Sequence, residues 1–409
     1  MNVFQMNVRL AEGGAANVAL LLHEKALENK IKSYFIYGYG KGLRDSSEHQ
    51  SVVNAIRRTH PVSALINKAS FDFLNVDLLG SPWPKYLSDH SHGQKDVIHM
   101  HVAHSYWMNF SSFYRFAQKW LAQSNTLIWT LHDHWAITGR CAFLDGCNRW
   151  KESCYSCPKL DNYPPVRFDN ANRLIKDKQN KIRSLVQLGM KLVSPSKHLA
   201  NDVESVYGDK NLFVIPNSIQ QSSLDEIKNL ATEINQEGCI LTGKVNAGVI
   251  ANDLSYEGKT NRILIQTILE QNKYSNDFKL HTIGKNSPFK GPSVVNHGFI
   301  SSKSDITRIL SQLDCMIFSS RVDNYPLIIC ECLCLGIPVL AVDSSASREI
   351  LNQFNIKPLS ESNIAMLATK SRTEILAHLS NISSKSLSEK AIDLFSPNTM
   401  FNSYMNIYK

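Results

Sequence analysis

The stretch Val3–Lys30, VFQMNVRLAEGGAANVALLLHEKALENK, contains the pattern that decides the fold. It begins with an apolar run of strand length, Val3–Val8, and passes through a tight turn at Gly13-Gly14. It ends in Ala15–Lys30, where apolar residues recur at helical spacing. Strands that alternate with helices in this way are typical of parallel α/β sheets rather than of sandwiches or helical bundles. We therefore expect an α/β fold.

The alternation of strand and helix occurs in two successive series. In the first half we predict further strands at Tyr34–Tyr37, Val97–Val102, Thr126–Leu131 and Lys191–Ser194. The second series predicts strands at Ala247–Ala251, Lys279–Ile283, Asp314–Ser319 and Pro338–Val342. Helices of the second series are predicted at Thr260–Gln271, Lys303–Gln312 and Leu327–Leu335. Ser222–Gly243, rich in Glu, Asn and Gln, is the predicted connection between the two series.

Two series indicate two Rossmann-like, doubly wound parallel-sheet domains, and 409 residues suffice for two cores. We place the first domain at residues 1–220, with a cysteine-rich insertion at 139–160, and the second at 221–395. Helix 396–409 is expected to pack back on the first domain. Because open parallel sheets bind ligands beyond the carboxyl ends of their strands, we expect the domains to face a ligand across a cleft.

Composition and charge narrow the class of protein. With 43% apolar and 20% charged residues, the chain is globular rather than disordered. No apolar run approaches the ~18 residues that span a bilayer, and the start has no export signal, so we expect a cytoplasmic protein. Residues 1–200 hold 25 Lys and Arg against 15 Asp and Glu, whereas residues 201–409 hold 19 against 21. The basic first half suggests an anionic partner such as a membrane surface, nucleic acid or a phosphorylated substrate.

Several candidate functional residues directly follow or occupy predicted strands of the first half. Gly13 and Gly14 open a helix where backbone N–H groups can bind an anion, and the alternative is a plain strand-to-helix turn. His132 follows a strand at the edge where ligands bind, and the alternative is a structural histidine. His99 and His101 share one strand face by period-two geometry, so we expect one of them to line the same cleft.

Four of the nine cysteines fall within 17 residues, at Cys141, Cys147, Cys154 and Cys157. The final Cys-x-x-Cys has the spacing that tetrahedral zinc sites favour, and four thiolates would make the site structural rather than catalytic. Reduced core cysteines and a redox or iron–sulfur role are the alternatives.

Two carboxylates and a lysine mark the second half. Asp323 and Glu331 lie eight positions apart across a predicted loop-to-helix junction. Carboxylates beside a helix N-terminus can bind sugar hydroxyls while backbone N–H groups receive phosphate; helix capping with a solvated Glu is the alternative. Lys259 lies between a predicted strand and helix, where its ammonium group could meet a phosphate, and the alternative is a solvated lysine. Three further cysteines at 330, 332 and 334 are interpreted as small core residues of a helix.

Together these motifs resemble the retaining GT-B glycosyltransferases of family 4 over nearly the whole chain. The most specific is Asp323-x7-Glu331 with its exit Gly336-Ile-Pro338-Val, similar to the family's E-x7-E motif, although the first acid here is Asp. His132-Asp-His-Trp135, followed by Thr138-Gly-Arg-Cys141, resembles the colanic-acid type of exopolysaccharide glycosyltransferase. Further matches are Gly13-Gly14, Thr130-Leu-His132, Val193-Ser-Pro-Ser196 and Ile215-Pro-Asn217-Ser218.

The resemblance implies a GT-B fold and the transfer of a hexosyl group, with retention, from a nucleotide sugar to a polyprenyl-diphosphate-linked oligosaccharide. It implies catalytic roles for His132 and Asp323, with His99 and His101 as candidates on the acceptor side. The donor site that it implies consists of Gly13, Gly14, Lys259, Asn324, Tyr325, Pro326, Leu327 and Glu331.

No cofactor is expected for catalysis, and the only metal considered is the structural zinc. The expected partners are the nucleotide sugar donor, the lipid-linked oligosaccharide acceptor and an anionic membrane surface, with no nucleic acid. The protein is then peripheral at the inner face of the cytoplasmic membrane. The alternatives are a nucleotide-sugar epimerase of the same fold and, less favoured, a zinc-containing nucleic-acid-binding protein.

Overall fold

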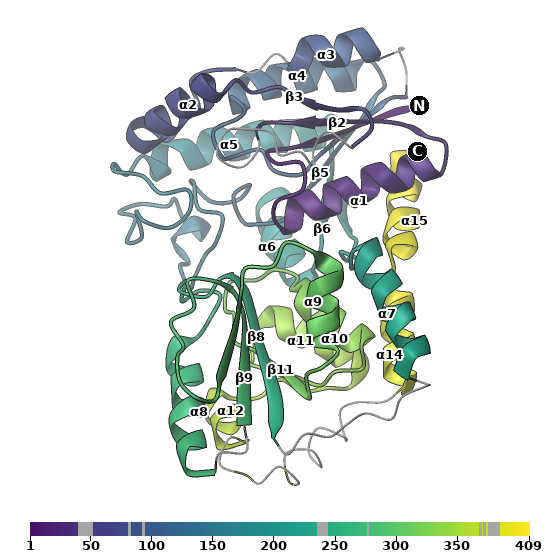
Figure 1. The fold of residues 1–409 in the computed structure, drawn as a ribbon. Coiled ribbons are helices and arrows are strands. Elements are labelled where there is room, and N and C mark those ends of the chain that lie inside the picture. Colours follow the sequence, from purple (N-terminus) through teal and green to yellow (C-terminus); the bar gives the residue numbers. More distant parts are fainter. Residues whose placement is uncertain are drawn as a thin grey trace. The chain divides into compact units, whose positions relative to one another are not determined.

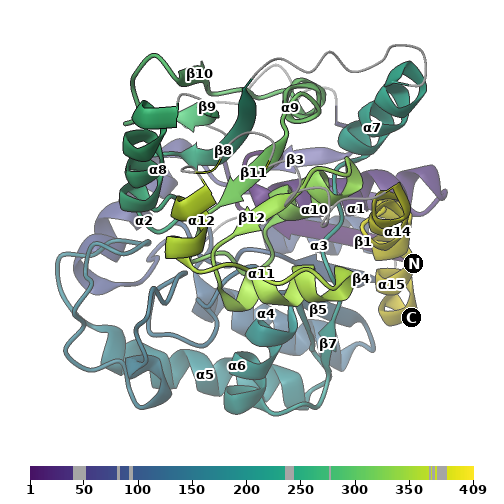
Figure 2. The ribbon, with the colours of Figure 1, turned by 90° about the horizontal axis from the view of Figure 1, so that it is seen from below.

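The computed structural model describes residues 1–39, 52–80, 83–91, 95–234, 244–275, 278–367 and 385–409, together with positions 370 and 374. These residues form two compact units, which Figures 1 and 2 show from two sides. Unit 1 comprises Met1–Pro216 and Met400–Lys409, and unit 2 comprises Asn217–Thr399. Each unit is built on one parallel sheet, which confirms the predicted fold class. Among the described helices, none is long and apolar enough to cross a membrane.

Unit 1 contains seven parallel strands in the order β3-β2-β1-β4-β5-β6-β7. The strand order reverses between β1 and β4, and such a switch point is where open α/β sheets bind ligands. Both strands are buried along their whole length because helices cover both faces of the sheet. The strands are β1 (Asn2–Asn7), β2 (Lys32–Tyr37), β3 (Ala55–Arg57), β4 (Val97–Met100), β5 (Thr126–Thr130), β6 (Lys191–Ser194) and β7 (Leu212–Val214).

The helices of unit 1 include one from the far end of the chain. Helix α15 (Pro397–Tyr408) lies beside α1 in Figure 1, and its Tyr404 and Tyr408 are buried in one apolar cluster with Val3 and Val97 of the sheet. The other helices are α1 (Gly14–Glu28), α2 (Pro61–Leu74), α3 (Trp83–His90), α4 (Phe110–Ala122), η3 (Arg149–Lys151), α5 (Ala171–Gln187) and α6 (Lys197–Tyr207).

Unit 2 contains five parallel strands in the order β10-β9-β8-β11-β12. They are β8 (Val245–Asp253), β9 (Phe278–Lys285), β10 (Val294–Gly298), β11 (Cys315–Phe318) and β12 (Val339–Ala341). The helices are α7 (Gln221–Ile234), α8 (Arg262–Ser275), α9 (Lys303–Leu310), α10 (Leu327–Cys334), α11 (Ser345–Leu351), η4 (Asn352–Phe354), α12 (Glu361–Leu367) and α14 (Lys385–Leu394).

Two apolar cores cover the two faces of the unit 2 sheet. Along β11, Cys315 and Ile317 belong to one core and Met316 and Phe318 to the other, as the period of two in a strand requires. The first core includes α8 and α12, and the second includes α7, α9, α10, α11 and α14. Cys330, Cys332 and Cys334 are fully buried in the second core, which confirms their interpretation as core residues.

The structure differs from the sequence-based expectation at the sheet edges and at the connection. Strands β3, β7 and β10 were not predicted, because they are only three to five residues long and partly exposed, and short exposed strands have little apolar periodicity. The segment Ser222–Gly243, predicted to connect the two series, contains α7, whose apolar side packs in unit 2. Its residues 235–243 lie outside the described part of the chain.

Candidate active site

The carboxyl edge of the unit 2 sheet brings together two motifs that are far apart in the sequence. Lys259 follows β8, Asp323 follows β11, and their side chains form an ion pair between Lys259 Nζ and Asp323 Oδ1. The backbone holds the two loops in register, since Arg321 N donates to Gly258 O at 3.0 Å. The candidate cation and the first acid of the motif therefore occupy one site.

The second acid of the motif, Glu331, lies on α10 and is only 3% exposed. Lys303, the first residue of α9, places its Nζ 3.6 Å from Glu331 Oε1, which makes an ion pair but is too long for a hydrogen bond. Within the described residues, Glu331 Oε1 accepts no hydrogen bond. A buried carboxylate oxygen without a donor is costly, and a ligand hydroxyl would satisfy it. Lys303 was not predicted, although a lysine that opens a helix after a strand is a signal for it.

Further buried polar atoms at this edge have no hydrogen-bond partner among the described residues. Thr260 Oγ1 and Asn261 Nδ2 have no hydrogen-bond partner within the described part of the chain, and both side chains are at most 4% exposed. Helix α10 follows Asp323 in the chain with Pro326 as its N-cap, so the first N–H groups of the helix are not used within it. Asn324 and Tyr325, which precede the cap, are buried. This edge therefore combines acceptors, donors and a cation, as a polyhydroxyl phosphate ligand requires.

The first loop of unit 1 is shaped by its two glycines. Gly13 has φ +98°, a left-handed backbone conformation that side chains with a Cβ rarely adopt, and it caps α1 without a side-chain hydrogen bond. A Cβ on either Gly13 or Gly14 would meet no atom within 4 Å. The predicted turn is therefore open at the positive end of a 15-residue helix, where an anion is stabilised.

His132 begins a chain of hydrogen bonds that runs through the interior of unit 1. Its Nε2 lies 3.0 Å from Nδ1 of His101, and Nε2 of His101 lies 2.9 Å from Oε1 of Gln5. Gln5 Nε2 donates to Tyr408 Oη at 3.1 Å, and this oxygen lies 2.9 Å from Nδ1 of His99. Because an amide oxygen only accepts, neutral His101 donates from Nε2 and accepts at Nδ1, so His132 carries its proton on Nε2.

The chain continues beyond His99 to the last helix. His99 Nε2 lies 2.7 Å from Thr130 Oγ1, which in turn lies 2.9 Å from Tyr404 Oη. All four ring nitrogens of His99 and His101 are thus bonded to protein groups, and both rings are buried. The structure therefore places these two candidates behind His132, where they orient it, rather than at a surface that an acceptor could touch.

Burial keeps the three histidines neutral. It lowers the pKa of His132 from 6.5 to about 4, although the neighbouring Asp133 opposes the shift. Burial, followed by the nearby histidines, lowers the pKa values of His99 and His101 well below 6.5. At neutral pH His132 therefore acts as a hydrogen-bonding group without charge.

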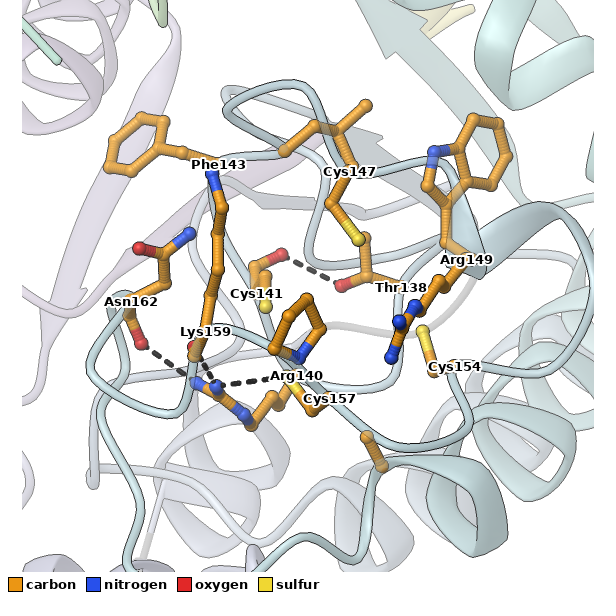
Figure 3. A pocket seen from close by; sticks show the side chains of 14 residues that line it. Thr138, Arg140, Cys141, Phe143, Cys147, Arg149, Cys154, Cys157, Lys159 and Asn162 are labelled. Atoms are coloured by element: carbon orange, nitrogen blue, oxygen red, sulfur yellow. Dashed lines mark hydrogen bonds between the residues drawn. The ribbon is translucent and has the colours of Figure 1, made fainter.

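The four cysteines of the predicted insertion line one pocket of about 420 Å³, shown in Figure 3. A hydrogen bond from the Cys141 thiol is the main reason why the pKa of Cys157 is lowered to about 5. The Lys159 backbone and Arg140 act in the same direction, and together these contacts outweigh burial, which would raise this pKa. Cys154 Sγ instead accepts the Gly139 N–H at 3.3 Å. All four thiols are reduced.

The prediction of a structural zinc at these cysteines is not supported. Within the described residues, no group of three or more His, Cys, Asp or Glu side chains is arranged to hold a metal ion. The physical reason is that the sulfur atoms of Cys154 and Cys157 are engaged by separate protein donors, Gly139 N and Arg140 Nη2, instead of converging on one point.

A second cavity of unit 1, of about 580 Å³, lies between the end of α2, the loops after β4 and β5, and α5. Two polar atoms of its lining residues, Asp77 Oδ1 and Trp135 Nε1, are buried without a hydrogen-bond partner among the described residues. Burial raises the pKa of Asp77 to about 8. Lys178, which also lines the cavity, has its pKa lowered to about 7 by burial. Asp77 was not predicted because no motif marks it, and Trp135 appeared only as the last residue of the motif His132-Asp-His-Trp135, without a role.

Comparisons with known proteins agree with this arrangement. The family described as glycosyl transferases group 1 matches residues 246–377, which include Lys259, Asp323 and Glu331. The putative colanic acid biosynthesis glycosyl transferase WcaC of Escherichia coli strain K12 is 41% identical over 411 residues, and the match covers 100% of both chains.

Solved structures resemble the whole chain. Sucrose-phosphate synthase from Thermosynechococcus elongatus has a TM-score of 0.60 at 12% identity, covering 100% of this chain and 98% of that one. WaaG, a glycosyltransferase involved in lipopolysaccharide biosynthesis, has a TM-score of 0.58 at 10% identity, covering 98% and 99%. At such identities the likeness concerns the fold alone, and it confirms the predicted GT-B architecture. The family match and the full-length relative together show that the chain belongs to the glycosyl transferases group 1 family and is a glycosyltransferase.

Proposed function

We propose that the protein transfers a hexosyl group from a nucleotide sugar to a polyprenyl-diphosphate-linked oligosaccharide, with retention of anomeric configuration, in exopolysaccharide biosynthesis of the colanic-acid type. The full-length similarity to WcaC supports the pathway. The family assignment does not favour an epimerase or a nucleic-acid-binding protein.

The observation that carries the donor side is the carboxyl edge of the unit 2 sheet. The same edge holds the buried Glu331, whose Oε1 accepts no hydrogen bond from the described residues, the Lys259–Asp323 ion pair and the N-terminus of α10. In the proposed complex, Glu331 accepts hydrogen bonds from the ribose, and Asp323 contacts the transferred sugar. The backbone N–H groups near Asn324–Leu327 receive the diphosphate.

The proposed chemistry depends on stabilising the departing diphosphate. Lys259 would exchange part of its contact with Asp323 for the diphosphate, and the helix N–H groups would add fixed donors where negative charge develops. Neutral His132 would hydrogen-bond the transferred sugar near its reacting carbon. The acceptor hydroxyl would lose its proton to a leaving-group oxygen on the same face, which gives retention.

For the acceptor sugar we assign the second cavity of unit 1, which lies between the end of α2, the loops after β4 and β5, and α5. Its lining combines Phe71, Phe110 and Trp135 with polar groups. At neutral pH the protonated Asp77 carboxyl can donate, and the indole N–H of Trp135 is a second donor without a partner in the described chain. Aromatic faces with such buried donors suit a sugar better than a wholly apolar molecule.

The substitution Glu331→Gln tests the donor site, because it keeps the side-chain shape and removes the charge. We expect the rate of transfer at low donor concentration to fall by about 10- to 100-fold. This fall corresponds to the loss of roughly 1.5–3 kcal/mol from a hydrogen bond to a charged group. Transfer is measured on membranes that carry the lipid-linked acceptor, with UDP-galactose, GDP-fucose and UDP-glucose as donors. Glu270→Gln, an exposed site on α8, is the matched control.

Two outcomes would contradict the proposal. If Glu331→Gln transferred as fast as the control with the active donor, Glu331 would not bind the ribose. If the wild type converted a nucleotide sugar to its epimer without any acceptor, the reaction class would be wrong.

A further inference from the structure

Helix α2 and the segment after it expose an unusual number of large apolar side chains. Between residues 62 and 79 these are Val62 (54% exposed), Leu65 (54%), Ile66 (44%), Phe73 (48%), Leu74 (44%), Leu78 (54%) and Leu79 (36%). Phe168, 57% exposed, lies against Phe73 with ring centroids 5.9 Å apart. We call these eight residues the apolar patch. An exposed apolar cluster of this extent marks an interaction surface.

The helix directs a row of apolar side chains outward, while polar and apolar side chains share its buried side. Val62, Leu65, Ile66 and Phe73 recur at helical spacing and form one outward stripe. The buried residues of the helix are Ala64, Asn67, Ser70 and Phe71, of which two are polar. The four apolar side chains of the outward stripe therefore stand where an ordinary surface helix carries polar ones.

Buried hydrogen bonds hold this orientation. Asn67 Nδ2 donates to Tyr106 O at 3.2 Å and to Leu79 O at 3.1 Å, and Asn67 Oδ1 accepts the Leu79 N–H at 2.8 Å. Ser70 Oγ donates to Val76 O at 2.9 Å. Rotating α2 to bury its apolar stripe would break these bonds, and the same bonds fix the segment that carries Leu78 and Leu79 beside the helix.

Basic side chains accompany the apolar patch. Lys68 is exposed on α2, and the exposed Arg167 places its guanidinium 5.4 Å from the centroid of the Phe73 ring. Both belong to the basic first half of the chain, residues 1–200, which contains 25 Lys and Arg but only 15 Asp and Glu. Apolar side chains accompanied by Lys and Arg fit the interface of an anionic bilayer, where the chains enter the acyl boundary and the cations meet lipid phosphates.

We propose that the apolar patch docks on an anionic lipid bilayer, with Leu65 and Phe73 inserted and with Arg167 and Lys68 on lipid phosphates. The same segment lines the proposed acceptor cavity through Phe71, Asn75, Val76 and Asp77. A lipid-linked acceptor could therefore keep its lipid in the bilayer while its sugar enters the cavity. That link rests on the proposed function, whereas the docking does not.

Vesicle sedimentation with the full chain tests the docking. The vesicles contain phosphatidylcholine alone or with phosphatidylglycerol. The double variant Leu65→Gln/Phe73→Gln is expected to lower the partition coefficient about 100-fold, roughly tenfold for each large apolar side chain. Ile263→Gln, which removes a 79% exposed side chain from α8, is the control and should change partitioning less than twofold. Arg167→Gln should weaken binding about fivefold on anionic vesicles only.

Two results would overturn the docking. The first is equal partitioning of the double variant and the Ile263→Gln control. The second is a wild-type dimer, seen by sedimentation without lipid, that the double variant abolishes while vesicle binding persists; the patch would then join two copies of the chain. Vesicle binding through the patch in a protein that transfers no sugar would refute only the proposed function.

Discussion

Lowering the pH from 7.5 to 5 is expected to reduce the unfolding free energy of unit 1 through His132. Burial lowers the pKa of His132 to about 4 in the folded protein, whereas the unfolded chain keeps the ordinary value of 6.5. The unfolded state therefore binds the proton first, so the stability is complete above pH 6.5 and declines as the pH falls toward 4. Proton linkage between the folded pKa of about 4 and the unfolded pKa of 6.5 lowers the unfolding free energy by about 2 kcal/mol at pH 5. The loss reaches about 3 kcal/mol once the pH lies below both pKa values. His99 and His101 act in the same direction.

Intrinsic fluorescence can follow unit 1 by itself. All six tryptophans lie in it, at Trp83, Trp107, Trp120, Trp129, Trp135 and Trp150. Urea unfolding monitored by this signal at pH 7.5, 6.5, 5.5 and 5.0 gives the free energy for the wild type and for His132→Gln. The wild type should lose about 2 kcal/mol more than the variant across this range. His281→Gln is the control, because burial also lowers the pKa of His281 to about 4 but this residue belongs to unit 2.

Comparing slopes rather than absolute stabilities removes the constant cost of either substitution. Equal losses in the wild type and His132→Gln would refute the reasoning, because His132 would then bind protons equally in the folded and unfolded chains. The neutral, hydrogen-bonded arrangement of His132 with His101 would also be wrong.

Two further predictions concern the cavities of unit 1. Asp77→Ala should raise the KM for the lipid-linked acceptor about tenfold and leave the donor KM within twofold, since it removes the carboxyl donor from the cavity; a change in the donor KM alone would contradict the acceptor assignment. Cys157 should be alkylated by iodoacetamide at pH 6 faster than Cys154, because its pKa is lowered to about 5 mainly by the Cys141 thiol, whereas burial raises that of Cys154. Mass spectrometry of the labelled peptides measures the alkylation rates of Cys154 and Cys157, and equal rates would show that Cys157 is not a thiolate.

The sequence predicted the parts of the site that depend on local pattern. Lys259 and Asp323 could be placed together because each follows a buried parallel strand, and such strands end at one edge of the sheet. Glu331 was found by its spacing from Asp323. Lys303 opens a predicted helix but was not predicted as a site residue, because the strand before that helix, β10, is short and partly exposed and was itself not predicted.

Side-chain contacts between residues far apart in the chain could not be predicted from the sequence. Gln5 and Tyr408 are hydrogen-bonded across 403 positions, and neither residue belongs to a motif, so their support of His132 could not be anticipated. The zinc prediction failed for a related reason: cysteine spacing limits which sulfur atoms can meet, but the direction of each thiol depends on contacts such as Gly139 N–H to Cys154.

The apolar patch shows a further limit of periodicity. Helical spacing reveals that Leu65, Ile66 and Phe73 share one side of α2, but it does not reveal which way that side faces. The direction is decided by Asn67, whose amide bonds to Leu79 and Tyr106 bury a polar residue where an apolar one is usual. Sequence periodicity alone would assign these apolar residues to the core.

The return of α15 to unit 1 has a consequence for biosynthesis. The sheet of unit 1 is translated before residue 217, but Tyr404 and Tyr408, which complete its buried hydrogen bonds to Thr130 and Gln5, emerge from the ribosome nearly 200 residues later. Until then the nascent sheet keeps buried polar groups unpaired and the apolar surface around Val3 and Val97 uncovered. All of unit 2 is synthesised during this interval, so unit 1, although first in the sequence, can complete these buried hydrogen bonds only after the residues of unit 2 have been made.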